Sequence, residues 1–163
     1  MVKFLKHSGI YTLEASQELD ISLSLAWNYF SSPNNLANIT PPKMGFNITS
    51  KVDKSVYQGQ IISYKVSPIS FIKINWVTEI TAVKEQEYFI DEQRLGPYSM
   101  WHHEHFFERI DDQNCKISDK ITYKIPLGFI GKLMHRLFIK KQLKTIFEYR
   151  HSQIEKLFKP KKN

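Results

Sequence analysis

The sequence predicts one α+β domain in which a curved antiparallel sheet of about seven strands wraps around a long C-terminal helix. Two observations predict this fold. Six strand-like runs follow one another between residues 46 and 125, and one helical periodicity spans the last 30 structured positions. Six consecutive antiparallel strands leave an apolar face that must be covered. A helix of that length measures about 45 Å, and no other element of the sequence could cover that face.

The N-terminal part is expected to form the first strand and two short helices. Gly9 to Ile21 alternates between two faces and is rich in strand-forming residues. Ser22 is a typical N-cap for a helix over Leu23 to Phe30. A second short helix, Asn34 to Ile39, should end at Thr40, because two prolines follow and proline disfavours the helical conformation in the residue before it.

The sheet is predicted to continue through six further strands. They are Phe46 to Val52, Gln60 to Val66, Lys73 to Val83, Glu87 to Leu95, Tyr98 to Ile110 and Lys116 to Ile125. The segments between them are short and are typical of turns that join antiparallel neighbours. They include Gly59, Ser67-Pro68, Lys84-Glu85, Gly96-Pro97 and Asp111 to Asn114.

The C-terminal segment changes from strand periodicity to helical periodicity after Pro126 and Gly128. Phe129 to Phe158 is typical of one long amphipathic helix, and we expect a kink near Lys140. Its inner side should carry the apolar residues Ile130, Leu133, Leu137, Leu143, Ile146, Phe147, Ile154 and Leu157.

The positive charge is concentrated at the C-terminus. Residues 1–128 hold 13 Lys and Arg against 14 Asp and Glu, whereas residues 129–163 hold ten against two. A solvated helix face with a basic tail at residues 159–163 (Lys159, Lys161 and Lys162) accounts for this excess. The alternative is a weak contact with an anionic membrane or RNA through the basic helix.

The remaining composition indicates a cytoplasmic protein of one domain. The only cysteine, Cys115, cannot form an intramolecular disulfide, which fits a reducing compartment. Met1 to Lys6 does not resemble a signal peptide, and no stretch approaches the roughly 18 apolar residues of a membrane span. No internal repeat or linker divides the 163 residues, so a single domain over 1–163 is expected.

Five motifs follow one another along the second half of the chain. They are Phe89-Ile90-Asp91-Glu92-Gln93, Gly96-Pro97-Tyr98, Trp101-His102-His103-Glu104-His105-Phe106, Asp119-Lys120-Ile121-Thr122-Tyr123 and Phe147-Glu148-Tyr149-Arg150. Their order and spacing resemble a bacterial ligand-binding branch of the START-related SRPBCC superfamily, which includes polyketide cyclases and the birch-pollen allergen group. The resemblance covers nearly the whole chain and implies the helix-grip fold with an internal cavity. That superfamily hosts carriers, sensors and cyclases, so the fold alone does not choose a function.

Strand parity identifies candidate cavity residues, because residues two apart share one face of a sheet. Trp101, His103, His105 and Phe107 share a face whose aromatic ends indicate that it points inward. The neighbouring strands should present Phe89, Asp91 and Gln93, and Ile117, Asp119, Ile121 and Tyr123, toward the same interior. The alternative parity would place His102 and Glu104 inside, alongside Met100 and Phe106, if a bulge intervened.

The resulting polar cluster needs internal partners. Buried carboxylates are costly unless paired, so Asp91 and Asp119 should contact the two histidines, or Arg150 from the helix. Trp76, Tyr64, Phe71 and Phe89 would complete an aromatic wall.

The function favoured by these residues is non-catalytic binding of a hydrophobic or amphipathic small molecule, such as a lipid, isoprenoid or polyketide-like compound. The expected ligand-binding residues are Trp76, Phe89, Asp91, Gln93, Trp101, His103, His105, Phe107, Asp119, Tyr123 and Arg150. One alternative is a hydrogen-bonded network that fixes strand register and helix docking and carries out no substrate chemistry.

Another alternative is a cofactor-independent cyclase, aromatase or dehydratase with His103 or His105 as base and Asp91 or Asp119 as its orienting partner. A third is an interaction module that uses the basic helix. His103 and His105, two residues apart on a strand, could share a metal with Asp119. No further pattern in the sequence fixes the third ligand, so no metal is expected. No phosphate loop, dinucleotide fingerprint or nucleophile elbow occurs, and no cofactor is expected.

Overall fold

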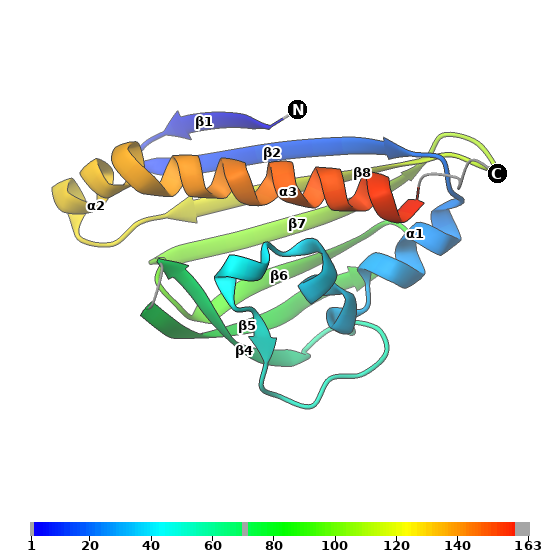
Figure 1. Cartoon of the computed structure of the whole chain (residues 1–163), viewed down its shortest axis with the longest axis horizontal. Coiled ribbons are helices and arrows are strands. Elements are labelled where there is room, and N and C mark those ends of the chain that lie inside the picture. Colours follow the sequence, from blue (N-terminus) through cyan, green and yellow to red (C-terminus); the bar gives the residue numbers. More distant parts are fainter. Residues whose placement is uncertain (1, 70–71, 159–163) are drawn as a thin grey trace.

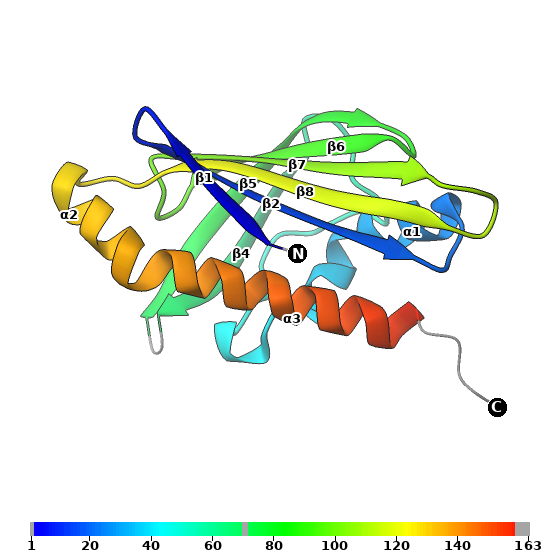
Figure 2. The same cartoon turned by 90° about the horizontal axis from the view of Figure 1, so that it is seen from above.

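The computed structural model describes residues 2–69 and 72–158, and it confirms the α+β fold (Figure 1). Eight strands form one open antiparallel sheet in the order β1-β2-β8-β7-β6-β5-β4-β3. Their bounds are β1 Lys3–His7, β2 Ile10–Leu19, β3 Asn47–Ile48, β4 Ile61–Ile69, β5 Ile72–Lys84, β6 Tyr88–Leu95, β7 Met100–Arg109 and β8 Cys115–Lys124. The C-terminal helix runs across one face of this sheet (Figure 2), as the need to cover an apolar face predicts.

Short helices follow β2 and close one end of the covered face. α1 (Leu23–Phe30) begins at the predicted N-cap Ser22, whose Oγ accepts a hydrogen bond from the Leu25 amide at 3.3 Å. Its Trp27 packs edge-on against Phe89 and Phe107 of the sheet. The second predicted helix is a 3-10 helix, η1 (Pro33–Ile39), and it is followed by the 3-10 turn η2 (Pro42–Met44).

The C-terminal helix is continuous from α2 (Gly128–Met134) through a π-helical segment, η3 (His135–Ile139), into α3 (Lys140–Phe158). The π-helical segment therefore ends next to Lys140, the position near which the sequence predicts a kink. The expected inner side is correct for four residues of α3, where Leu143, Phe147 and Ile154 are buried and Ile146 is half-buried. It is wrong for Ile130, Leu133, Leu137 and Leu157, which are exposed. α2 projects past the end of the sheet (Figures 1 and 2), so its apolar side chains have no strand to cover.

The strand count differs from the predicted seven because β1 precedes the first predicted strand. It pairs with β2 from Lys3↔Glu14 to His7↔Ile10. The connection is a two-residue turn in which Ser8 and Gly9 both have positive φ (47° and 78°), the geometry of a tight hairpin. The predicted run Phe46 to Val52 keeps only the two residues of β3.

The register of β6, β7 and β8 aligns the inward-facing polar residues. Asp91 lies opposite His103, and His105 lies opposite Asp119. Within the described residues, no helix is long and apolar enough to cross a membrane. Phe71 and the basic tail at residues 159–163 lie outside the described residues.

Candidate functional site

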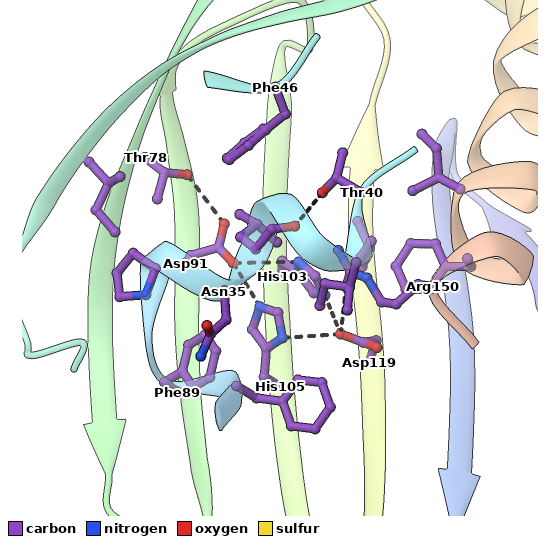
Figure 3. A pocket seen from close by; sticks show the side chains of 18 of the residues that line it. Asn35, Thr40, Phe46, Thr78, Phe89, Asp91, His103, His105, Asp119 and Arg150 are labelled. Atoms are coloured by element: carbon purple, nitrogen blue, oxygen red, sulfur yellow. Dashed lines mark hydrogen bonds and ion pairs between the residues drawn. The ribbon is translucent and has the colours of Figure 1, made fainter. Parts of the chain in front are cut away.

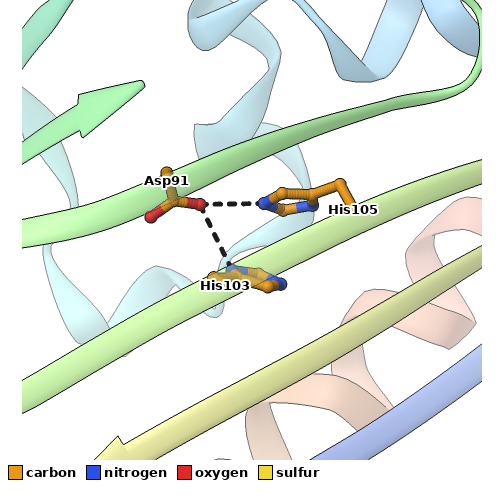
Figure 4. A group of neighbouring side chains, drawn as sticks. All are labelled: Asp91, His103 and His105. Atoms are coloured by element: carbon orange, nitrogen blue, oxygen red, sulfur yellow. Dashed lines mark hydrogen bonds and ion pairs between the residues drawn. The ribbon is translucent and has the colours of Figure 1, made fainter. Parts of the chain in front are cut away.

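Two histidines and two aspartates form a compact cluster on the inner face of the sheet (Figure 3), and Figure 4 shows Asp91 of this cluster with the two histidines. β7 supplies His103 and His105, β6 supplies Asp91, and β8 supplies Asp119. Their side chains are 7–17% exposed. Trp101, His103, His105 and Phe107 therefore face inward, as the sequence predicts. On the other face, His102 contacts Glu92 at 2.9 Å.

Each imidazole bridges both carboxylates. His105 places Nε2 2.9 Å from Asp91 Oδ2 and Nδ1 3.1 Å from Asp119 Oδ1. His103 places Nε2 2.8 Å from the same oxygen of Asp119, but its Nδ1 lies 3.4 Å from Asp91 Oδ2. The two rings lie 3.7 Å apart between centroids. His105 therefore makes two close contacts with carboxylates, whereas His103 makes one close contact and one longer contact.

These distances indicate the protonation states. A neutral imidazole can donate one hydrogen bond, and only the charged ring donates from both nitrogens. We therefore assign His105 as charged, and His103 as neutral with its proton on Nε2. Burial opposes the charge on His105, but hydrogen bonds with Asp119 and Asp91 outweigh it and raise the pKa of this ring. Burial and the nearby charge of His105 lower the pKa of His103.

The carboxylates are held ionised by these neighbours. Burial alone would raise the pKa of Asp119, but hydrogen bonds from His103 and His105 and the charge of Arg150 hold it well below its usual range. Burial would also raise the pKa of Asp91, but hydrogen bonds and the neighbouring histidines outweigh this effect and lower the pKa of that carboxyl. The Thr78 hydroxyl donates to Asp91 Oδ1 at 3.2 Å. With Arg150 and His105 positive and both aspartates negative, the cluster is neutral overall.

Arg150 connects the cluster to the long helix. Its Nη1 lies 3.6 Å from Asp119 Oδ1, and its guanidinium lies over the Phe147 ring at 4.9 Å from the centroid. The arginine predicted to reach the cluster from the helix therefore does so (Figure 3).

A cavity of about 220 Å³ lies between the sheet, the long helix and η1. Nine of the predicted ligand-binding residues line it: Trp76, Phe89, Asp91, Trp101, His103, His105, Phe107, Asp119 and Arg150. Aromatic rings form much of the wall, and Phe89 stacks on His105 at 4.1 Å between centroids. A polar cluster thus lies inside an otherwise apolar enclosure.

Three polar atoms of the cavity wall are buried and have no hydrogen-bond partner among the described residues. They are Tyr29 Oη, Trp76 Nε1 and Arg150 Nε. All three can donate a hydrogen bond, and two of them can only donate. Buried donors without acceptors are rare in folded proteins. An acceptor for these donors would have to come from outside the described residues.

Two predicted ligand-binding residues, Gln93 and Tyr123, are not among the residues that line this cavity. Gln93 is not among the lining residues, because its amide clasps the β6–β7 turn by donating to the Tyr98 carbonyl at 2.7 Å and accepting from the Tyr98 amide. Tyr123 faces inward but lies beyond the cavity, where its hydroxyl is 2.8 Å from His135 Nε2. His135 stacks on Tyr11 there.

Sequence reasoning missed the part of the wall that the helices supply. Tyr29 of α1, Leu36 and Ile39 of η1, and Leu143 and Phe147 of α3 line the cavity. Helical periodicity marks the inner face of α3 but does not show which inner residues border a void. No sequence signal distinguishes Tyr29 from an ordinary core aromatic residue.

Asp91, His103 and His105 also present one possible metal-ligand atom each, all within 4.8 Å of one another. These atoms are the ones that contact each other within the cluster. A cation would have to displace the proton that His105 shares with the carboxylates. The arrangement is accounted for more simply as a charge-balanced hydrogen-bond network.

The fold is shared with several solved structures. An aromatase/cyclase, Zhui of Streptomyces sp. R1128, is 11% identical, with a TM-score of 0.67 over 90% of this chain and 94% of that one. A START superfamily protein of Mycobacterium smegmatis is 9% identical, with a TM-score of 0.66 over 90% and 98%. The norcoclaurine synthase of Thalictrum flavum, in complex with dopamine and hydroxybenzaldehyde, is 15% identical, with a TM-score of 0.63 over 94% and 90%. At these identities the likeness shows the fold alone.

The sequence comparisons place the chain in a family. No curated protein matches the sequence. A family model described as a domain of unknown function (DUF8410) matches residues 30–158, which include every residue of the polar cluster and most of the cavity wall. The chain therefore belongs to the DUF8410 family, and it has the helix-grip fold of the START-related SRPBCC superfamily.

Proposed function

We propose that the protein binds an amphipathic small molecule in the cavity between the sheet and the long helix. The observation that carries the proposal is that three residues of a mainly aromatic wall each hold a buried donor with no hydrogen-bond partner in the described part of the chain. Binding pockets combine apolar walls with a few convergent polar groups in this way. The apolar body of the ligand would lie against Trp76, Phe89, Trp101 and Phe107.

The cavity volume limits the size of the ligand. An apolar cavity of roughly 150 Å³ accepts one benzene ring. About 220 Å³ therefore suits a molecule of one or two rings, or a short acyl chain. A long lipid or isoprenoid would have to extend beyond the cavity. We accordingly favour a compact aromatic or polyketide-like compound among the hydrophobic ligands considered.

The polar group of the ligand should be an oxygen acceptor. Arg150 Nε and Trp76 Nε1 can only donate, and Arg150 carries a positive charge. A carboxylate or an enolate-like oxygen would satisfy these donors and would gain a charge-assisted hydrogen bond. His103, His105, Asp91 and Asp119 would hold the arginine and the adjacent wall in place.

Replacing Arg150 by methionine should weaken the binding of an aromatic carboxylate by about 10- to 100-fold, because a hydrogen bond to a charged group is lost. The probe is 2-naphthoate, and isothermal titration calorimetry measures its affinity. The neutral alcohol 2-naphthalenemethanol should lose less than about threefold, since it gains little from the charge. Lys144→Met, an exposed change on the same helix, is the matched control.

Equal losses for both probes in Arg150→Met would show that the substitution damages the cavity and not charge recognition. Failure of the unsubstituted protein to bind either probe, together with native mass spectrometry that finds no compound on protein purified from its host, would refute the proposal.

A second candidate function is proton transfer, and the uncharged Nδ1 of His103 supports it. His103 lines the cavity, its Nδ1 lies 3.4 Å from Asp91 Oδ2 and carries no proton in our assignment, and the lowered pKa of the ring keeps this nitrogen available as a base. It could remove a proton from the carbon next to a carbonyl, while Arg150 Nε donates to the oxygen that becomes negative.

His103→Asn should slow such proton removal by about 100-fold. The assay is deuterium incorporation from D₂O into the ketone 2-tetralone, measured by NMR. His102→Asn is the control, since His102 faces the opposite side of the same strand. Exchange no faster with the unsubstituted protein than in buffer, or equal rates in both variants, would leave binding as the function.

A further inference from the structure

The N-terminal end of the long helix exposes an unusual amount of apolar surface. We call residues 127–138 the helix tip. Seven of the 17 large apolar side chains that are exposed in the described part of the chain lie within these 12 residues. Phe129 is 79% exposed and Leu127 is 73% exposed. Figure 2 shows α2 projecting past the ends of the strands, so this surface belongs to one protruding element.

The same element carries only positive charge. Residues 120–147 contain no aspartate or glutamate. Lys132 and Arg136 lie within the helix tip, and Lys140, Lys141 and Lys144 follow it; all five are exposed. An apolar protrusion with a basic margin is the composition of segments that lie in the interface of a membrane.

We propose that the helix tip docks on an anionic membrane surface. Phe129, Leu127 and the neighbouring apolar side chains would enter the boundary between headgroups and acyl chains. Lys132, Arg136 and Lys140 would contact the negative headgroups. The proposal does not depend on the ligand, but the helix that carries the tip continues into the cavity wall at Leu143 and Phe147.

Charge complementarity disfavours the other occupants of this surface. A second copy of the chain would bring two tips of the same positive charge together, which costs free energy. RNA would match the basic residues, but it offers no apolar partner for Leu127, Ile130 and Leu133. A lipid surface matches both the charge and the apolar side chains.

Co-sedimentation with vesicles tests the proposal. The full-length protein should bind vesicles of phosphatidylcholine with 30% phosphatidylglycerol, and bind pure phosphatidylcholine at least tenfold more weakly. Phe129→Ser and Lys132→Glu should each weaken the binding by about tenfold. Leu157→Ser, also an apolar-to-serine change, and Lys156→Glu lie at the other end of the helix and should have little effect.

A spectroscopic measurement separates insertion from adsorption. Phe129→Trp should show a blue-shifted fluorescence that brominated acyl chains quench, because tryptophan settles at the membrane interface. Circular dichroism checks that each variant folds.

Three results would overturn the proposal. The first is equal binding to both vesicle types. The second is vesicle binding that Phe129→Ser leaves unchanged. The third is no binding to the anionic vesicles; retention of RNA, or a dimer that Phe129→Ser dissociates, would then assign the surface to that partner.

Discussion

Replacing Asp119 by alanine is expected to lower the free energy of unfolding by about 3 to 5 kcal/mol, the loss typical of breaking a buried ion pair from one side. One oxygen of this carboxylate lies within 3.6 Å of both imidazoles and of Arg150. Without it, the charged ring of His105 keeps Asp91 as its carboxylate partner, whereas the buried guanidinium of Arg150 loses its ion pair with Asp119. Urea denaturation followed by tryptophan fluorescence measures the change.

The matched control is Asp112→Ala in the β7–β8 turn. Its carboxylate is 90% exposed and pairs with the exposed Arg109, so the loss should stay below about 1 kcal/mol. The double variant Asp119→Ala, Arg150→Met should recover part of the loss, because it removes one of the stranded charges. A loss in Asp119→Ala as small as in the control would contradict a dry, mutually dependent cluster.

The composition of this cluster could be predicted from the sequence because strand periodicity is strict. Trp101 and Phe107 fix the inward face of β7, and the two-residue repeat then places His103 and His105 inside. Short turns between β6, β7 and β8 make the three strands neighbours, so Asp91 and Asp119 follow. Because buried carboxylates need charged or hydrogen-bonding partners, Arg150 could be predicted as a partner from the helix.

Periodicity does not predict the environment of a residue whose side chain bonds to a neighbouring turn, or of a residue in an element that extends beyond the core. Gln93 has the correct parity, but its amide is used by the Tyr98 backbone next to the turn. Ile130 and Leu133 have the helical spacing of a buried face, yet α2, which carries them, extends past the sheet. The hydroxyl of Tyr123 forms a hydrogen bond with His135, a residue of the C-terminal helix and not of a strand. These outcomes depend on where elements end in space, which alternation along the chain does not specify.

His135 should make the protein sensitive to acid. Burial, together with the charges of Lys140 and Lys6, lowers the pKa of this imidazole to about 4 from 6.5. A folded-state pKa below the unfolded value gives stability that is complete above about pH 6.5 and is lost as the pH falls toward 4. The loss from this group should reach about 2 to 3 kcal/mol at pH 4.5. His103, whose pKa is also lowered, acts in the same direction.

Two variants isolate the contribution of His135. In His135→Gln, the difference in unfolding free energy between pH 7.5 and pH 4.5 should shrink by about 2 kcal/mol, because no buried imidazole remains there to be protonated. Tyr123→Phe removes the hydrogen bond at 2.8 Å but leaves the ring buried against Tyr11. Since burial is the main cause of the lowered pKa, this variant should keep the pH dependence of the unsubstituted protein. If Tyr123→Phe loses that dependence as fully as His135→Gln does, the hydrogen bond and not burial controls the titration.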